Sequence, residues 1–182
     1  SKLSPGTRCA LEHGGAAPVI IDHDADLDDA LPLLAKGGFY HAGQVCVSVQ
    51  KVFVHESRLD EFRKKLVKLA EKLVVGDPTD EKTEVGPLIQ ENEVNRVHQW
   101  VNEAKMAGAK ILTGGKKIGN TCYAPTVILN PPDEAMVSTH EIFGPVINIY
   151  SFKDRLRAIE RANFTPFSFQ AAVFTKSIDT AR

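Results

Sequence analysis

The sequence lacks the features that mark several large classes of protein. No apolar run approaches the ~20 residues that a membrane-spanning helix requires, and the first residues contain no apolar signal-peptide core. Neither sign of charge dominates, because 22 basic residues stand against 23 acidic ones and the net charge is −1. The basic footprint of a protein that binds nucleic acid or an acidic membrane is therefore absent. The sequence predicts no nucleic-acid partner and no membrane, and it favours a small molecule or another protein as partner.

Cysteine is scarce, and its pattern is not that of a bonded set. The three cysteines, Cys9, Cys46 and Cys122, are odd in number and include no CxxC pair, which argues against a disulfide framework and a structural zinc site. We expect Cys9 and Cys122 to be small buried residues. The acidic run 22–28 imitates the start of a calcium loop, but the sixth and twelfth loop positions are leucine rather than Gly and Glu. The sequence therefore predicts no metal site and a reducing, cytoplasmic setting.

Internal repeats and low-complexity segments are also missing, and strand and helix patterns alternate instead. Strands are expected at 7–12, 17–22, 52–54, 109–113, 123–129, 146–152 and 170–175. Helices are expected from Asp26 or Asp28 to about 37, from an N-cap at Ser57 to about 74, from about 91 to Gly108, from 154 to about 162, and after a cap at Ser177. This alternation predicts an α/β fold in which helices cover a sheet.

The stretch GQVCVS, residues 43–48, raises the question whether Cys46 is a nucleophile or a small buried residue. Free cysteines are among the most buried residue types. Gly43 removes side-chain bulk near the thiol, however, and Gln44 is a polar group of the kind expected where a backbone approaches a ligand. A nucleophilic thiol also needs positive charge, a helix N-terminus or a base nearby. His41 is a candidate base, although a solvated or packed histidine is the commoner case, so both interpretations of Cys46 stay open here.

Two further clusters carry a carboxylate beside a glycine. Glu12 lies at the expected end of a strand and directly before His13-Gly14-Gly15, where a carboxylate can project over a flexible turn into a cleft. Glu141 and Phe143 belong to HEIFGP, residues 140–145, which ends in a Gly-Pro turn before an expected strand. A solvated glutamate and an ordinary turn with a packed phenylalanine explain the same residues without a function, so these clusters decide nothing alone.

Taken together and in their order, the clusters resemble the NAD(P)-dependent aldehyde dehydrogenase superfamily. Residues 11–15 are similar to its general-base motif, 43–46 to its nucleophile motif and 141–145 to its cofactor-contacting motif. The separation of 34 positions, from Glu12 to Cys46, is also similar to the usual one. Further family-like segments are 76–78, 85–89, 124–126 and 161–163.

The resemblance implies a reaction and gives four residues a role in it. The Cys46 thiolate would attack an aldehyde, and the resulting thiohemiacetal would lose a hydride to NAD or NADP and become a thioester. Glu12 would be the general base for the water that hydrolyses this thioester. Glu141 would hold the ribose hydroxyls beside the nicotinamide, and Phe143 would position the nicotinamide ring. The backbone N–H of Cys46 would donate to the oxyanion.

The resemblance also implies how the chain is organised. Residues 1–15 would be a remnant of the last cofactor-domain strand and hinge, and residues 16–182 a catalytic domain with a mixed sheet, truncated at its C-terminal end. The rest of the cofactor domain would be missing, so the isolated chain would be inactive as a dehydrogenase. The complete enzyme would be a homo-oligomer, a dimer or a tetramer, acting on a small aldehyde. Two alternatives stay open: a non-catalytic binding or regulatory module, and a cofactor-independent thiol esterase that uses Cys46 and Glu12.

Overall fold

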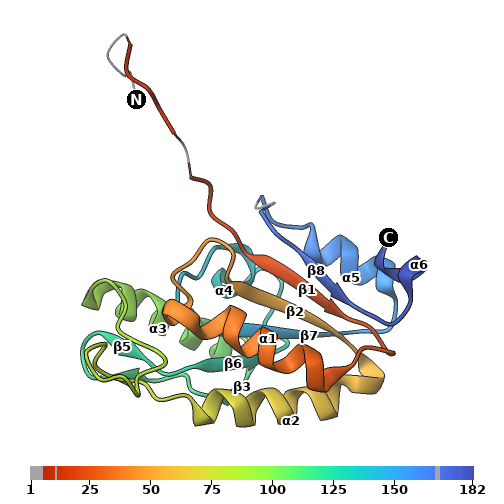
Figure 1. Ribbon diagram of the computed structural model, residues 1–182, viewed down its shortest axis with the longest axis horizontal. Helices are drawn as coiled ribbons and strands as arrows, with labels where there is room; N and C mark the ends of the chain where they lie inside the picture. The colour runs from red at the N-terminus through yellow and green to blue at the C-terminus, as the bar shows by residue number, and fades with distance from the viewer. Residues whose placement is uncertain (1–5, 11, 167–168) are drawn as a thin grey trace.

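A six-stranded sheet forms the centre of the computed structural model, which describes residues 6–10, 12–166 and 169–182 (Figure 1). Its strand order is β3-β6-β7-β2-β1-β8, and all neighbours are parallel except β3 and β6. The strands are β1 (Ala17–Ile21), β2 (Val49–His55), β3 (Lys110–Thr113), β6 (Thr126–Leu129), β7 (Val146–Phe152) and β8 (Ala172–Phe174). A small separate pair joins β4 (Lys117–Ile118) to β5 (Cys122–Tyr123). The expected α/β fold with a mixed sheet is confirmed.

Helices cover the sheet from both faces (Figure 1). They are α1 (Leu27–Phe39), α2 (Glu56–Lys72), α3 (Glu91–Met106), α4 (Met136–Thr139), α5 (Arg155–Ala162) and α6 (Ile178–Ala181), with a short 3-10 turn, η1 (Tyr40–Gly43). Among the helices of the described ranges, none is both long enough and apolar enough to cross a membrane.

The alternation of side chains along β2 shows why both faces are covered. Val52 and Val54 point into the larger core, which they share with apolar residues of α1 and α2. Phe53 points to the opposite face, where its ring stacks 5.1 Å from the ring of Tyr150 and packs in a second cluster with α5. Because both faces of the strand are covered, residues 52–54 form a short continuous apolar run, as is common in parallel sheets buried on both faces.

The helix α1 carries the chain from β1 to the loop that holds Cys46. As expected, it begins at an N-cap, because the Asp26 carboxylate accepts hydrogen bonds from the backbone N–H groups of Asp28 (3.0 Å) and Asp29 (3.4 Å). Near its other end, a β-carbon at Gly38 would overlap the side chain of Ile147 in β7. Glycine there lets the end of α1 pack directly on the sheet.

Several expected boundaries were wrong. Residues 7–10 and 12 form no strand; these residues are exposed and lead away from the body of the molecule (Figure 1), where no other strand pairs with them. Leu11 lies outside the described residues. Helix α2 begins at Glu56 rather than after Ser57, because His55 acts as the cap and its Nδ1 accepts the Ser57 N–H at 3.3 Å. The expected strand 123–129 is interrupted at Pro125, which has no N–H to donate.

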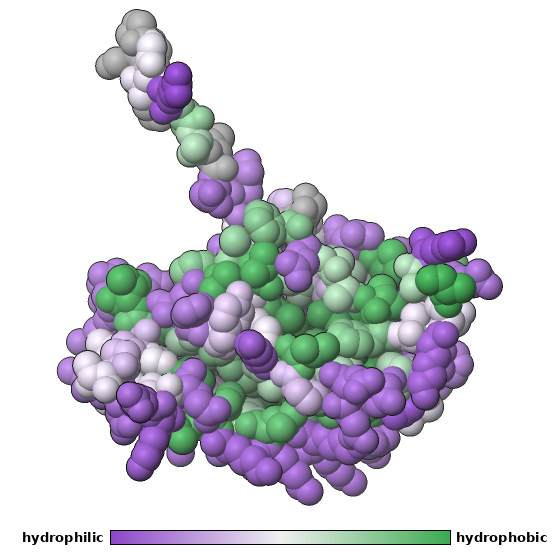
Figure 2. Space-filling view, in the orientation of Figure 1, coloured by the Kyte–Doolittle hydropathy of each residue, from purple (hydrophilic) through white to green (hydrophobic). Residues whose placement is uncertain are grey.

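One face of the molecule is hollowed and apolar. A groove of about 310 Å³ lies between α1, β1 and β8, and Figure 2 shows apolar side chains gathered over these elements. Its lining includes Val19, Leu33, Leu34, Val47, Val49 and Phe174. Since β8 is also an edge strand of the sheet, this face joins apolar side chains to unpaired backbone groups.

Candidate active site

The three clusters singled out in the sequence each stand directly before a strand. Gly14 and Gly15 precede β1, Cys46 precedes β2, and Gly144 precedes β7. These three strands are neighbours and run parallel, in the order β7-β2-β1. Their amino ends therefore meet at one edge of the sheet, and the topology alone brings the three clusters together.

Backbone contacts at Gly15 join the first cluster to the other two. The Gly15 N–H donates a hydrogen bond of 2.9 Å to Oε1 of Glu141. A β-carbon at Gly15 would overlap the carbonyl oxygen of Cys46, and a β-carbon at Gly14 would lie 2.5 Å from Oε2 of Glu141. The Glu141 carboxylate and the Cys46 backbone thus lie on either side of this glycine pair, in a space that larger residues would fill.

The loop before Cys46 has an unusual backbone. His41, Ala42 and Gly43 all have positive φ angles, of 49°, 54° and 71°. Only glycine adopts this region freely, and each other residue there costs about 1–3 kcal/mol. Such strain persists where the surrounding structure holds it, and it is concentrated at functional sites. After this turn the Ser48 N–H bonds the Val45 carbonyl at 2.9 Å, so half-buried Cys46 lies within a second tight turn.

Gln44 braces this loop instead of facing an open cleft. Its Nε2 donates to the carbonyls of His41 (3.1 Å) and Pro87 (3.2 Å), while its Oε1 accepts the Ile89 N–H (2.9 Å). The loop is therefore fastened to the segment 85–89, one of the family-like segments of the sequence. A second fastening is steric, because a β-carbon at Gly43 would overlap the Gly144 carbonyl oxygen.

Two residues that the sequence did not single out hold the cluster around Glu141. Gln50, in β2 and only 4% exposed, donates from Nε2 to the carbonyls of Val137 (3.1 Å) and His140 (2.7 Å) and accepts the Ile142 N–H at 2.8 Å. Arg96, in α3, donates to the Ile142 carbonyl at 2.8 Å. The sequence signal for Gln50 was weak, because it stands beside Lys51 and before the apolar residues 52–54 on which the expected strand was based.

Phe143 follows this clamped segment and projects outward. Its φ is 50°, a rare value for a bulky side chain, and the residue is 41% exposed. An exposed ring on a strained backbone, two residues after a half-buried carboxylate, is a surface suited to contact a ligand.

Glu12 and His41 are not held against Cys46. Glu12 is exposed, and in the described part of the chain it makes no hydrogen bond or ion pair. It lies three residues before Gly15, so its Cα is at most about 11 Å along the chain from the contact with Cys46. The His41 ring is also exposed, 4.9 Å from the Tyr40 ring between centroids. The structure thus brings together the backbones of the clusters around Cys46 and Glu141, and it leaves the Glu12 side chain apart.

The other two cysteines were wrongly expected to be buried. Cys9 is exposed, because it belongs to the segment that leaves the body of the molecule, and Cys122 is half-buried in β5 at the small separate strand pair. All three cysteines are free thiols.

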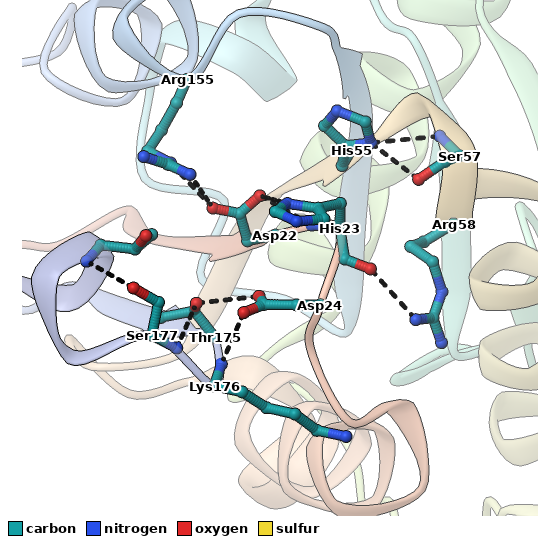
Figure 3. A network of polar contacts seen from close by, with 11 residues as sticks. Asp22, His23, Asp24, His55, Ser57, Arg58, Arg155, Thr175, Lys176 and Ser177 are labelled. Carbon is teal, nitrogen blue, oxygen red and sulfur yellow. Dashed lines mark hydrogen bonds and ion pairs between the residues drawn. The ribbon is translucent and has the colours of Figure 1, made fainter.

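The opposite edge of the sheet carries a polar network (Figure 3). The buried carboxylate of Asp22, directly after β1, accepts from Nε (2.8 Å) and Nη2 (2.6 Å) of Arg155 and contacts the His23 ring. Asp24 accepts from the Thr175 hydroxyl at 2.8 Å and from the Lys176 N–H at 3.1 Å. These contacts tie β8 and α5 to β1.

This network also offers a set of metal ligands, but they are already engaged. Ligand atoms of Asp22, His23 and Asp24 lie within 4.8 Å of one another. Burial raises the pKa of Asp22, yet hydrogen bonds from His23 and Arg155 outweigh that effect and hold it below its ordinary value. Because both carboxylates already accept hydrogen bonds, the cluster acts as a brace between elements.

Comparison with known proteins finds similarity to one family along nearly the whole chain. Residues 2–182 match the sequence profile described as the aldehyde dehydrogenase family. A 3-sulfolactaldehyde dehydrogenase of Priestia megaterium is 40% identical over 174 residues, which are 96% of this chain and 36% of that protein. The chain thus spans about a third of the length of such relatives.

Solved structures of the same kind superpose closely. A glyceraldehyde-3-phosphate dehydrogenase of Methanocaldococcus jannaschii, solved with NADP, has a TM-score of 0.88 and 40% identity over 93% of this chain and 36% of that one. A betaine aldehyde dehydrogenase of Staphylococcus aureus, solved with NAD+, has a TM-score of 0.89 and 35% identity over 94% of this chain and 35% of that one.

Proposed function

The chain belongs to the aldehyde dehydrogenase family, and from this premise we propose that it supplies the nucleophile-bearing part of an enzyme that oxidises an aldehyde to a carboxylic acid with NAD or NADP. The observation that carries the proposal is the meeting of the three clusters around Gly15, at the amino edge of β1, β2 and β7. Similarity to the NADP- and NAD+-bound enzymes above supports the cofactor class.

In this proposal Cys46 is the nucleophile and forms both covalent intermediates. Its sulfur attacks the aldehyde carbon, and the carbonyl oxygen becomes the oxyanion of a thiohemiacetal next to the Cys46 backbone N–H, which donates to it. Loss of a hydride from that carbon leaves a thioester. Glu12 takes a proton from a water molecule whose oxygen attacks the thioester carbon, so that the carboxylic acid and the free thiolate are released. Glu12 has to swing toward Cys46 for this step, which its exposed position allows.

Glu141 and Phe143 fit the nicotinamide and ribose end of a dinucleotide. The carboxylate is half-buried and oriented by the Gly15 N–H, the space beside it is kept open by Gly14, and the Phe143 ring is exposed next to it. A ribose diol and a flat ring are the chemical counterparts of these two groups. The dinucleotide, when bound, accepts the hydride. The 182 residues contain no GxGxxG loop for its diphosphate.

The same premise supports a division of the chain and an assembly. We propose that residues 16–182 are the catalytic domain and that residues 1–15 lead from the cofactor domain. The exposed edge strand β8, beside the apolar groove of Figure 2, supports a homo-oligomer in which another copy covers this face. Three free thiols support a reducing, cytoplasmic setting.

A chimera tests the reaction directly. The segment of the Methanocaldococcus jannaschii enzyme that matches this chain is replaced by residues 6–182, and NADPH formation from glyceraldehyde-3-phosphate is followed at 340 nm. We expect steady turnover, and its loss in the chimera with Cys46→Ser. The matched variant Cys122→Ser should keep its activity. A folded chimera in which Cys46→Ser turns over normally would contradict the assignment of the nucleophile.

The isolated chain separates the two alternatives. With 4-nitrophenyl acetate and no cofactor, the proposal predicts that an acetyl group on Cys46 is found by mass spectrometry and that its release is slow. Rapid repeated turnover would favour a thiol esterase. A folded chain with no adduct at Cys46 would favour a binding module.

A further inference from the structure

A separate cavity of about 240 Å³ lies on the face of the sheet that carries α5. Its lining comes from β2, β7, α5 and the segments beside them, and includes Lys51, Phe53, Asp133, Tyr150, Arg161 and Phe164. The rings of Phe53 and Tyr150 are stacked, with an interplanar angle of 21°, and form an aromatic wall. The volume is below the 300–1,000 Å³ typical of sites for drug-sized ligands, so a small molecule is the natural occupant.

Lys51 gives this cavity an unusual charge. The residue is only 4% exposed, and within the described ranges it takes part in no hydrogen bond and no ion pair. Lysines are almost never so buried unless they are paired. Burial lowers the pKa of Lys51 to about 8, with the charge of Asp133 acting in the opposite sense and that of Arg161 adding to it. At neutral pH the cavity therefore holds an ammonium group that lacks a counter-ion.

The carboxylates around the cavity are already matched by other cations. Asp133 pairs with Arg161 through two contacts, Oδ1 to Nη2 at 2.6 Å and Oδ2 to Nε at 3.2 Å. Glu160 pairs with Arg157 at 2.9 Å. The guanidinium of Arg161 lies 4.7 Å from the centroid of the Tyr150 ring, which holds it in place. One positive charge is left over, and it belongs to Lys51.

We propose that this cavity binds a small aromatic carboxylate. The ligand's carboxylate is the missing counter-ion of Lys51, in a charge-assisted hydrogen bond, and its ring packs against Phe53 and Tyr150. The inference is independent of the proposed reaction, because the site lies on the α5 face of β2 and uses none of the residues around Cys46.

Calorimetric titration of the 182-residue chain with benzoate at pH 7 tests this proposal. We expect a dissociation constant below about 1 mM, and binding of benzyl alcohol, which has the ring without the charge, at least tenfold weaker. Lys51→Met should weaken benzoate binding at least tenfold. The matched control Lys153→Met removes a lysine whose side chain is 79% exposed and should leave the affinity unchanged. Thermal unfolding of each variant shows whether it is folded.

The pH dependence gives a second readout. Benzoate binds the protonated amine, whose pKa is about 8, so the affinity should fall about tenfold between pH 7 and pH 9. The other charged side chains lining the cavity are Asp133, Glu160 and Arg161, and burial raises the pKa of Tyr150, so that its hydroxyl stays neutral in this range. Lys51→Arg, which stays protonated, should bind with a flat profile.

Four outcomes would overturn the proposal. Equal affinity for benzoate and benzyl alcohol would mean that the cavity binds only the apolar ring. Unchanged benzoate binding by Lys51→Met would mean that Lys51 does not pair with the ligand carboxylate. Displacement of benzoate by an equal concentration of chloride would mean that the site binds small anions in general and does not select an aromatic carboxylate. No binding at 10 mM benzoate would mean that Lys51 turns to the unpartnered buried Oδ1 of Asn148, its neighbour in the register of β2 and β7.

Discussion

Among the glycines, Gly15 is the position at which an added β-carbon should destabilise the fold the most. In Gly15→Ala the methyl group would overlap the Cys46 carbonyl oxygen, a backbone atom that cannot move aside cheaply, so we expect a loss of about 1–3 kcal/mol in the free energy of unfolding. Urea denaturation measures this loss. Gly86→Ala is the matched control, because its nearest neighbour would be 4.0 Å away, and it should change the stability by less than about 0.5 kcal/mol. Equal stabilities of the two variants would contradict the close approach.

Gln50 makes a second prediction at this scale. Gln50→Leu keeps the approximate size of the side chain but leaves the Ile142 N–H and the His140 carbonyl without this partner, whereas the Val137 carbonyl still accepts from Nδ2 of Asn148 at 2.7 Å. An unsatisfied buried group costs about 1–3 kcal/mol. Amide exchange of Ile142 should become faster, by hydrogen-exchange mass spectrometry or NMR. Gln99→Leu, whose amide donates to Glu103 on the surface of α3, should leave that exchange unchanged. Unaltered exchange in Gln50→Leu would rule out the clamp.

The surroundings of a residue could be predicted from the sequence where its partners lie close along the chain, and not where they lie far away. Gly43 and Cys46 lie three positions apart, so their neighbourhood could be judged directly. The partners of Gln50 are about 90 positions away, at Val137, His140 and Ile142, and no local pattern announces them. For Glu12 the sequence left a solvated and a cleft-facing carboxylate open, because the choice depends on which strands lie beside the segment.

At the scale of elements, the start of α1 offers a test of how the helix that leads to the Cys46 loop is stabilised. Asp26→Ala removes the cap of the helix, and we expect a loss of about 1 kcal/mol in the free energy of unfolding. Asp29→Ala removes a nearby exposed charge of the same sign that is not the cap, and it should cost less than half as much. Both are measured by chemical denaturation at pH 7. Equal losses would mean that charge, rather than capping, matters at this end.

Elements with their own periodicity were predicted well. β7 spans Val146–Phe152, the range expected from its apolar run, and α5 (Arg155–Ala162) agrees with the helix expected from 154 to about 162. The strand expected at 7–12 failed for a different reason, since a strand is stable only when its backbone groups find a partner and the sequence does not say whether one is present. The minor elements, η1, α4 and β4, were missed because four residues or fewer carry no recognisable period.

At the scale of the whole molecule, Asp22 links three elements and makes the stability depend on pH. Its pKa in the folded chain lies below the ordinary 3.8, because hydrogen bonds from His23 and Arg155 outweigh the opposing effect of burial. The carboxylate therefore contributes stability above about pH 4, and this contribution is lost as the pH falls through the lowered pKa.

Comparison of the wild-type chain with Asp22→Asn tests this contribution. We expect the variant to be less stable by about 1.5–3 kcal/mol at pH 7, the usual worth of hydrogen bonds to a charged group, and the difference to shrink below pH 4. Urea denaturation from pH 7 to pH 3 measures both. Asp60→Asn, at a carboxylate that is 78% exposed, should differ little from wild type at any pH. A difference that grows on acidification would reverse the assigned sign.

The position of β1 has a consequence for how the protein is made. β1 lies inside the finished sheet, yet one of its two neighbours is β8, and the contact between Asp24 and Thr175 joins residues 151 positions apart. During synthesis β1 leaves the ribosome before β8 does, and this side of β1 stays unpaired until β8 has also emerged. For that interval an apolar strand, Ala17–Ile21, presents open backbone groups to the surrounding solution. A strand that is buried in the native state can thus pair with another nascent chain before β8 arrives.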